Sequence, residues 1–156
     1  MRPDSAITID PQAGEILAIA GGSYRIVLSG EQTGGAFATI EMTVPPKGGP
    51  NPHAHAAIQE SFYVLEGEVV FKTETQSYTA TKGASITIPQ GGAVHCFKNE
   101  SDAPARLLCT VVPAGLDAFF REAAQLVPTA PDMKERVQEL ATKYGQELFP
   151  PDYFNQ

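Results

Sequence analysis

An all-β fold, built as a sandwich or barrel of short strands, is predicted by three features of the 156-residue sequence. Short apolar runs recur at regular intervals between about Ala6 and Val112, with turn signals between them. The chain contains 14 glycines and 13 prolines, which supply many turns. Hydrophobic residues make up 42% of the chain, enough for a core, and the length is that of a single domain.

The expected strands follow one another along this stretch. Two apolar runs come first: EILAIA ends just before Gly21, and YRIVLS ends just before Gly30. In GAFATIEMTV alternate residues share a face, and we expect one set to be buried: Ala38, Ile40, Met42 and Val44. Pro45 ends this strand because proline cannot donate a hydrogen bond to a neighbouring strand. Further strands are expected in SFYVLE, GEVVFKTE, QSYTATKG, SITIPQ, AVHCFKN and RLLCTVVP.

The pattern changes after Pro113, where apolar residues recur at helical spacing. Two helices are expected, with the apolar stripes Leu116, Phe119, Phe120, Ala123 and Met133, Val137, Leu140, Tyr144. Pro131 suits the first turn of the second helix and Gly145 its C-terminal cap. We therefore expect a β-domain at residues 1–113 and a helical tail at residues 114–156, packed on that domain or on a partner subunit.

Charge and hydropathy narrow the class of protein. Eleven lysines and arginines against eighteen acidic residues give a net charge of −7, and no basic run stands out. Nucleic acid and membrane surfaces are therefore not expected as partners. The N-terminal segment lacks the apolar stretch of a signal peptide, and no segment approaches the roughly 18 apolar residues of a membrane span. These features predict a cytoplasmic protein.

The sequence contains three histidines, and His53 and His55 stand two residues apart. On a strand these side chains share a face, with their bases about 7 Å apart, so both rings can reach one ion. Imidazole nitrogens bind zinc, iron, nickel and copper well. Glu60 is the candidate acidic ligand, yet in an unbroken strand Gln59 would share the face of His55 instead. Glu60 can join the histidines only if the chain turns or bulges within AAIQ.

The third histidine, His95, enters a strand after the turn IPQGGAV. Alternation places Phe97 and Asn99 on its face and Cys96 on the other. Asn99 is expected to be a turn or strand-end residue. If Asn99 pairs with Arg106, then Cys96 lies opposite Cys109 on the face away from the histidines. Two free thiols are expected in a reducing cytoplasm.

Together these residues resemble the two sequence motifs of the cupin family. The first motif is matched by His53, His55, Glu60 and Gly67, and the second by Gly83, Pro89, His95 and Asn99. The spacing from Pro89 to His95 is one residue longer than the common form, and either Gly91 or Gly92 takes the place of the motif glycine. The resemblance implies an antiparallel jelly-roll β-barrel, a cupin, with a short C-terminal helical segment.

The resemblance also implies a ligand set. His53, His55, Glu60 and His95 would hold one divalent transition metal (iron, manganese, nickel, zinc, cobalt or copper), and Glu60 would also act as a catalytic base. The pattern is similar to small cupins of the quercetin dioxygenase type. The leading hypothesis is a metal-dependent dioxygenase for a small phenolic or enolic substrate. The alternatives are a non-catalytic small-molecule-binding or sensing cupin and a redox-neutral isomerase.

A homodimer is expected from exposed sheet edges and from the apolar stripes of the tail.

Overall fold

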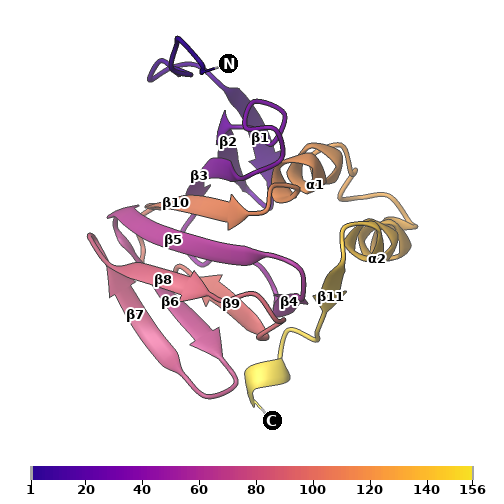
Figure 1. Ribbon diagram of the computed structural model, residues 1–156. Helices are drawn as coiled ribbons and strands as arrows, with labels where there is room; N and C mark the ends of the chain where they lie inside the picture. The colour runs from indigo at the N-terminus through magenta and orange to yellow at the C-terminus, as the bar shows by residue number, and fades with distance from the viewer. Residues whose placement is uncertain (1, 156) are drawn as a thin grey trace.

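The computed structural model describes residues 2–155, which form two antiparallel sheets that face each other (Figure 1). The six-stranded sheet contains, in spatial order, β1 (Glu15–Ile19), β2 (Gly22–Leu28), β3 (Ala38–Val44), β10 (Ala105–Val112), β5 (Gln59–Glu66) and β8 (Ser85–Ile88). The five-stranded sheet contains β11 (Gln146–Leu148), β4 (His53–His55), β9 (His95–Lys98), β6 (Glu68–Thr73) and β7 (Ser77–Thr81). The all-β prediction is confirmed, and the two sheets form a jelly-roll-like sandwich.

The core lies between the sheets and follows the predicted alternation. In β3 every second residue is buried, and these are the predicted Ala38, Ile40, Met42 and Val44. Three phenylalanines from both sheets, Phe62, Phe71 and Phe97, pack with ring centroids 5.1 to 5.5 Å apart. Burial of such apolar surface is the main force that holds the two sheets together.

The connection from β9 to β10 crosses from one sheet to the other, and Asn99 holds it in place. The Asn99 side chain is fully buried and donates to the backbone oxygens of Val44 and Ala103 at 3.1 and 2.7 Å. It also accepts from the amide and hydroxyl of Ser101 at 3.0 and 2.7 Å. The prediction of a turn residue is confirmed.

This crossover contradicts the predicted pairing of the two cysteines. β10 pairs with β3 and β5, whereas β9 pairs with β4 and β6, so Cys96 and Cys109 belong to different sheets. The predicted register assumed that β9 and β10 form a hairpin, whereas the chain between them crosses from one sheet to the other. Both thiols are free, as expected.

The tail contains α1 (Leu116–Ala123), α2 (Met133–Lys143), strand β11 and a 3-10 turn at Tyr153–Asn155. Helix α1 packs on β1 and β3, and α2 packs on β11, which extends the five-stranded sheet (Figure 1). Gly145 lies just beyond α2 with φ +68°, which confirms the predicted C-terminal end of this helix. Pro131 lies before the N-cap residue Asp132, so it precedes the first turn rather than forming part of it.

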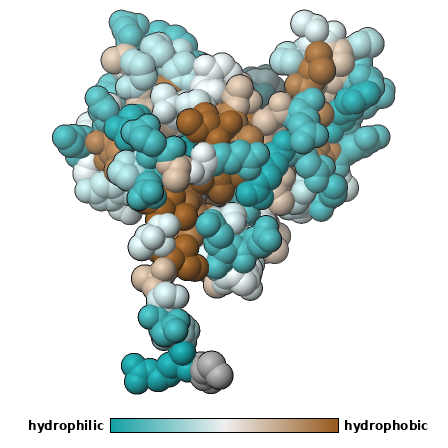
Figure 2. Space-filling view, turned by 90° about the horizontal axis from the view of Figure 1, so that it is seen from above, coloured by the Kyte–Doolittle hydropathy of each residue, from teal (hydrophilic) through white to brown (hydrophobic). Residues whose placement is uncertain are grey.

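Apolar side chains gather in the middle of the face seen from above in Figure 2, near the N-terminal segment. Ile16 on the edge strand β1 is 66% exposed. The homodimer stays a prediction, which this apolar surface motivates. Within residues 2–155, no helix has the length and apolar character that a membrane crossing requires.

Candidate metal centre

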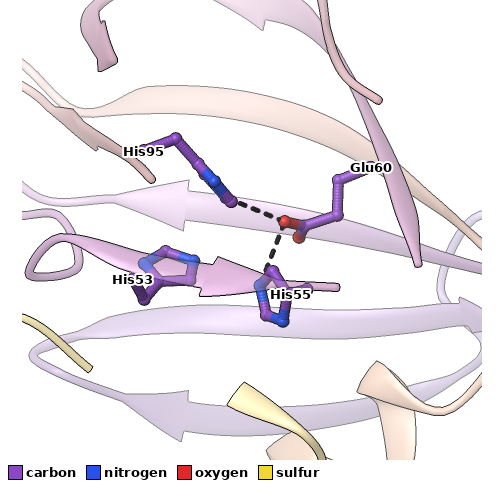
Figure 3. A group of neighbouring side chains, drawn as sticks. All are labelled: His53, His55, Glu60 and His95. Carbon is purple, nitrogen blue, oxygen red and sulfur yellow. Dashed lines mark hydrogen bonds and ion pairs between the residues drawn. The ribbon is translucent and has the colours of Figure 1, made fainter. Parts of the chain in front are cut away.

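Four side chains predicted to act together converge between the two sheets. His53 and His55 come from β4, His95 from β9 and Glu60 from β5, which lies in the opposite sheet. Figure 3 shows the three imidazoles and the carboxylate pointing toward one another. One candidate ligand atom from each residue lies within 4.8 Å of all the others. The structure therefore brings together every predicted site residue.

A break between strands β4 and β5 explains how Glu60, rather than Gln59, joins the histidines. β4 ends at His55, two bends follow at Ala56 and Ala57, and β5 begins in the other sheet at Gln59. Glu60 is only 3% exposed, whereas Gln59 faces solvent. The change of sheet resets the alternation, and this selects the carboxylate over the neighbouring amide.

Backbone carbonyls fix the tautomers of two histidines. Nδ1 of His53 lies 2.8 Å from the oxygen of Asn51, and Nδ1 of His95 lies 2.8 Å from the oxygen of Ala93. A carbonyl oxygen can only accept, so Nδ1 carries the proton in each ring. Each Nε2 therefore faces the site, and in the neutral ring its lone pair is available to a metal.

The geometry fits a divalent ion. Glu60 Oε2 lies 3.2 Å from Nε2 of His55 and 3.0 Å from Nε2 of His95. Two ligand atoms on one metal can be at most about 4.2 Å apart, so a pair 4.8 Å apart must draw in by about 0.6 Å. Nε2 of His55 is buried, and its contact with Glu60 is an ion pair without hydrogen-bond geometry, so a further group can still satisfy this nitrogen. An ion bound by three nitrogens and one carboxylate would do so.

Electrostatics keep the group in a metal-binding protonation state. Burial, together with the nearby His95 and His55, lowers the pKa of His53 to about 4, so its imidazole is neutral at pH 7. Burial alone would raise the pKa of Glu60. The contacts with His55 and His95 outweigh burial and hold that pKa well below its usual value, so the carboxylate is ionised.

Two further polar groups lie around Glu60 that sequence reasoning did not assign to the site. Cys109 is fully buried, and its Sγ lies 3.9 Å from Oε1 of Glu60. This corrects its predicted position on the face away from the histidines. Burial and the negative charge of Glu60 raise the pKa of Cys109 well above the usual value, so it is a thiol. Tyr24 is also buried beside this group, and burial raises the pKa of its hydroxyl, with Cys109 and Glu60 adding to the effect.

Comparison with known proteins relates the stretch around the site to a known domain family. The model of the cupin domain matches residues 40–111, the stretch that carries all four site residues. Residues 40–111, a little under half of the chain, therefore match a cupin domain. The jelly roll of the chain also resembles solved cupin structures, at identities that show the fold alone.

The proteins that the chain resembles are distant in sequence. The chain is 27% identical over 121 residues to quercetin 2,3-dioxygenase of Bacillus subtilis, a match that covers 76% of the chain and 35% of the relative. The match thus spans about a third of that enzyme's length. A sugar phosphate isomerase of the cupin superfamily from Silicibacter pomeroyi is 22% identical with TM-score 0.60, covering 68% of this chain and 75% of that one. KdgF from Halomonas sp. is 13% identical with TM-score 0.64, covering 73% and 99%.

A cavity of about 910 Å³ opens from the candidate metal centre toward the helical tail. His53, His55 and Glu60 line its inner end. Much of its wall is apolar and comes from segments without any motif, including Phe119 and Phe120 on α1, Met133 on α2 and Phe149 after β11. The apolar stripes of the tail were expected to dock on the β-domain or on a partner subunit, but their part in forming this cavity was not predicted.

Proposed function

We propose that this protein is a metal-dependent dioxygenase that acts on a small phenolic or enolic substrate, with His53, His55, Glu60 and His95 as the metal ligands. The observation that carries the proposal is the group of three imidazoles and one carboxylate, all buried except the half-buried His53, beside a large apolar cavity. The distant similarity to quercetin 2,3-dioxygenase supports the substrate class. A redox-active divalent ion held by these four residues would act as a Lewis acid and would supply the electron transfer that a reaction with dioxygen needs.

The lining of the cavity supports an uncharged or weakly acidic aromatic substrate. Among residues 2–155, the lining includes the charged side chains Glu60 and Lys134 but no arginine. Lys134 is exposed on α2, at the tail side of the cavity. Recognition of a phosphate usually relies on several donors or on arginine, so a phosphorylated sugar is a poor match. Aromatic and proline side chains instead favour a flat apolar body.

Glu60 is suited to a second role as a proton acceptor. Its Oε2 contacts both imidazoles, whereas the contact recorded for Oε1 is the Cys109 thiol at 3.9 Å. Oε1 can therefore accept a proton while Oε2 stays with the histidines. The proton would come from an acidic hydroxyl of the substrate, such as an enol or phenol.

Oxygen consumption tests this proposal. Protein loaded separately with iron(II), manganese(II) or nickel(II) is incubated with flavonols and β-diketones while dissolved oxygen and substrate are followed. We expect oxygen uptake coupled to substrate loss with at least one metal. Zinc-loaded protein provides a redox-inert control, and the His95→Ala variant provides a control with an incomplete ligand set.

Other outcomes would assign other functions. Turnover without oxygen would indicate a redox-neutral isomerase. Tight ligand retention with no turnover for any metal would indicate a binding or sensing protein. Purified protein that retains none of these metals would contradict the proposed ligand set.

A further inference from the structure

The tail places one polar side chain beside the candidate metal centre. β11 pairs antiparallel with β4, and Gln146 lies directly opposite His55 in that register. Residues directly opposite each other in an antiparallel pair point to the same face, with their Cβ atoms about 5 Å apart. Since His55 points into the site, Gln146 does as well, and it lines the cavity. Its neighbour Glu147 lies opposite Ala54 and is exposed.

The amide of Gln146 has no partner that explains its position. The residue is 9% exposed, its side chain makes no hydrogen bond within residues 2–155, and its amide atoms are accessible from the cavity. A primary amide offers two donors and an acceptor, which can bind a polar group of a ligand in that cavity. The other glutamine in the lining, Gln138, is exposed on α2 and reaches Thr142 at 3.5 Å. Gln146 is therefore the glutamine of the lining whose amide lies beside the site and remains free to bind a ligand.

We propose that Gln146 is a specificity-determining residue, whose amide hydrogen-bonds an oxygen substituent of the substrate next to the oxygen bound at the metal centre. The inference rests on the proposed function and narrows its substrate class. The substrate has an apolar ring system that fills the cavity and at least one further hydroxyl or carbonyl near its reactive end. The tail thereby contributes a substrate contact, which the cupin motifs alone do not include.

Binding of two probes to zinc-loaded protein under nitrogen tests this assignment, because no oxygen chemistry interferes. Quercetin carries ring hydroxyls beyond the chelating pair, whereas 3-hydroxyflavone carries only that pair. The change in flavonol absorbance on chelation gives the dissociation constants. We expect Gln146→Leu to weaken quercetin binding about 3- to 15-fold, the effect of one lost hydrogen bond, with 3-hydroxyflavone binding unchanged.

Matched variants separate this role from a structural one. Gln146→Met, which keeps the length of the side chain, should show the same selective loss. Glu147→Gln on the opposite face of β11 should bind both probes as the wild type does. Zinc content and the thermal midpoint should not change in any of these variants.

The outcomes distinguish this inference from the proposed function. If Gln146→Leu and Gln146→Met bind both probes as the wild type does, or lose both equally, the specificity role is wrong and the proposed function stands. If zinc-loaded wild-type protein binds neither probe, the proposed substrate class is wrong and the inference falls with it.

Discussion

His53 and His95 face each other across the paired strands β4 and β9, with ring centroids 4.4 Å apart. Each ring is held by a carbonyl two residues earlier in the chain, that of Asn51 or Ala93. The same kind of hydrogen bond therefore orients both imidazoles toward one point from two neighbouring strands. Such outer hydrogen bonds orient metal-binding histidines and fix their tautomer.

Removing one of these rings should abolish tight metal binding. His95→Ala is expected to weaken the binding of zinc or nickel by about 100-fold or more, because one nitrogen ligand is lost from a set of four. Elemental analysis of purified protein and titration with the metal measure this. Lys98→Ala on the exposed face of β9 is the matched control and should bind metal normally. Equal metal content in both variants would refute the assignment of His95.

Glu60 and Gln59 form a natural pair for testing which residue belongs to the site. Glu60→Gln should lower metal affinity and remove oxygen consumption, because the charged oxygen ligand and the proton acceptor are both lost. Gln59→Ala alters the exposed neighbour and should leave both properties unchanged. Loss of metal in Gln59→Ala but not in Glu60→Gln would reverse the assignment.

The metal-free protein should lose stability on acidification partly through His53. The folded pKa is about 4 against an ordinary value of 6.5, so the unfolded chain takes up the proton first. The contribution of His53 is complete above pH 6.5 and is lost as the pH falls toward 4. Urea unfolding across this range should show a shallower pH dependence for His53→Asn than for the wild type. Parallel curves for the two proteins would contradict the lowered pKa.

Asn99 should be among the most sensitive positions outside the site. Asn99→Ala removes a buried side chain that makes four hydrogen bonds and leaves backbone groups of the β9–β10 crossover unpaired. We expect a loss of about 2–4 kcal/mol in the free energy of unfolding. Chemical denaturation measures the loss, and Ser101→Ala, which removes a more peripheral hydroxyl, should cost less. A loss below that of Ser101→Ala would argue against this role for Asn99.

The two thiols should differ in reactivity because they belong to different sheets. Cys96 is half-buried on β9, whereas Cys109 is fully buried on β10 and its pKa is raised well above normal. A thiol reagent should modify Cys96 in the native state and reach Cys109 only after unfolding. Native Cys96→Ser protein should therefore not react on the same timescale. Rapid modification of that variant would show that Cys109 is accessible.

The strands could be predicted from the sequence because their alternation is local, as the buried face of β3 illustrates. The cupin motifs also indicated all four candidate ligands. Whether β9 and β10 form a hairpin or cross between sheets could not be predicted, since both need only a polar turn, and the Cys96–Cys109 register was wrong for this reason.

Gln146 was missed because β11 is three residues long and lacks a strand pattern of its own. Its position depends on pairing with β4, which lies about ninety residues earlier in the chain. No local signal in the sequence reports such a contact.

The cavity that leads to the candidate centre is lined in part by Pro150 and Pro151, close to the C-terminal end of the described chain. A polyhistidine purification tag fused at that end would bring spare imidazoles to the entrance, where they would compete for added nickel or zinc. The N-terminal segment lies at the far side of the sandwich (Figure 1). A removable tag placed there would keep metal analyses and ligand titrations free of this artefact.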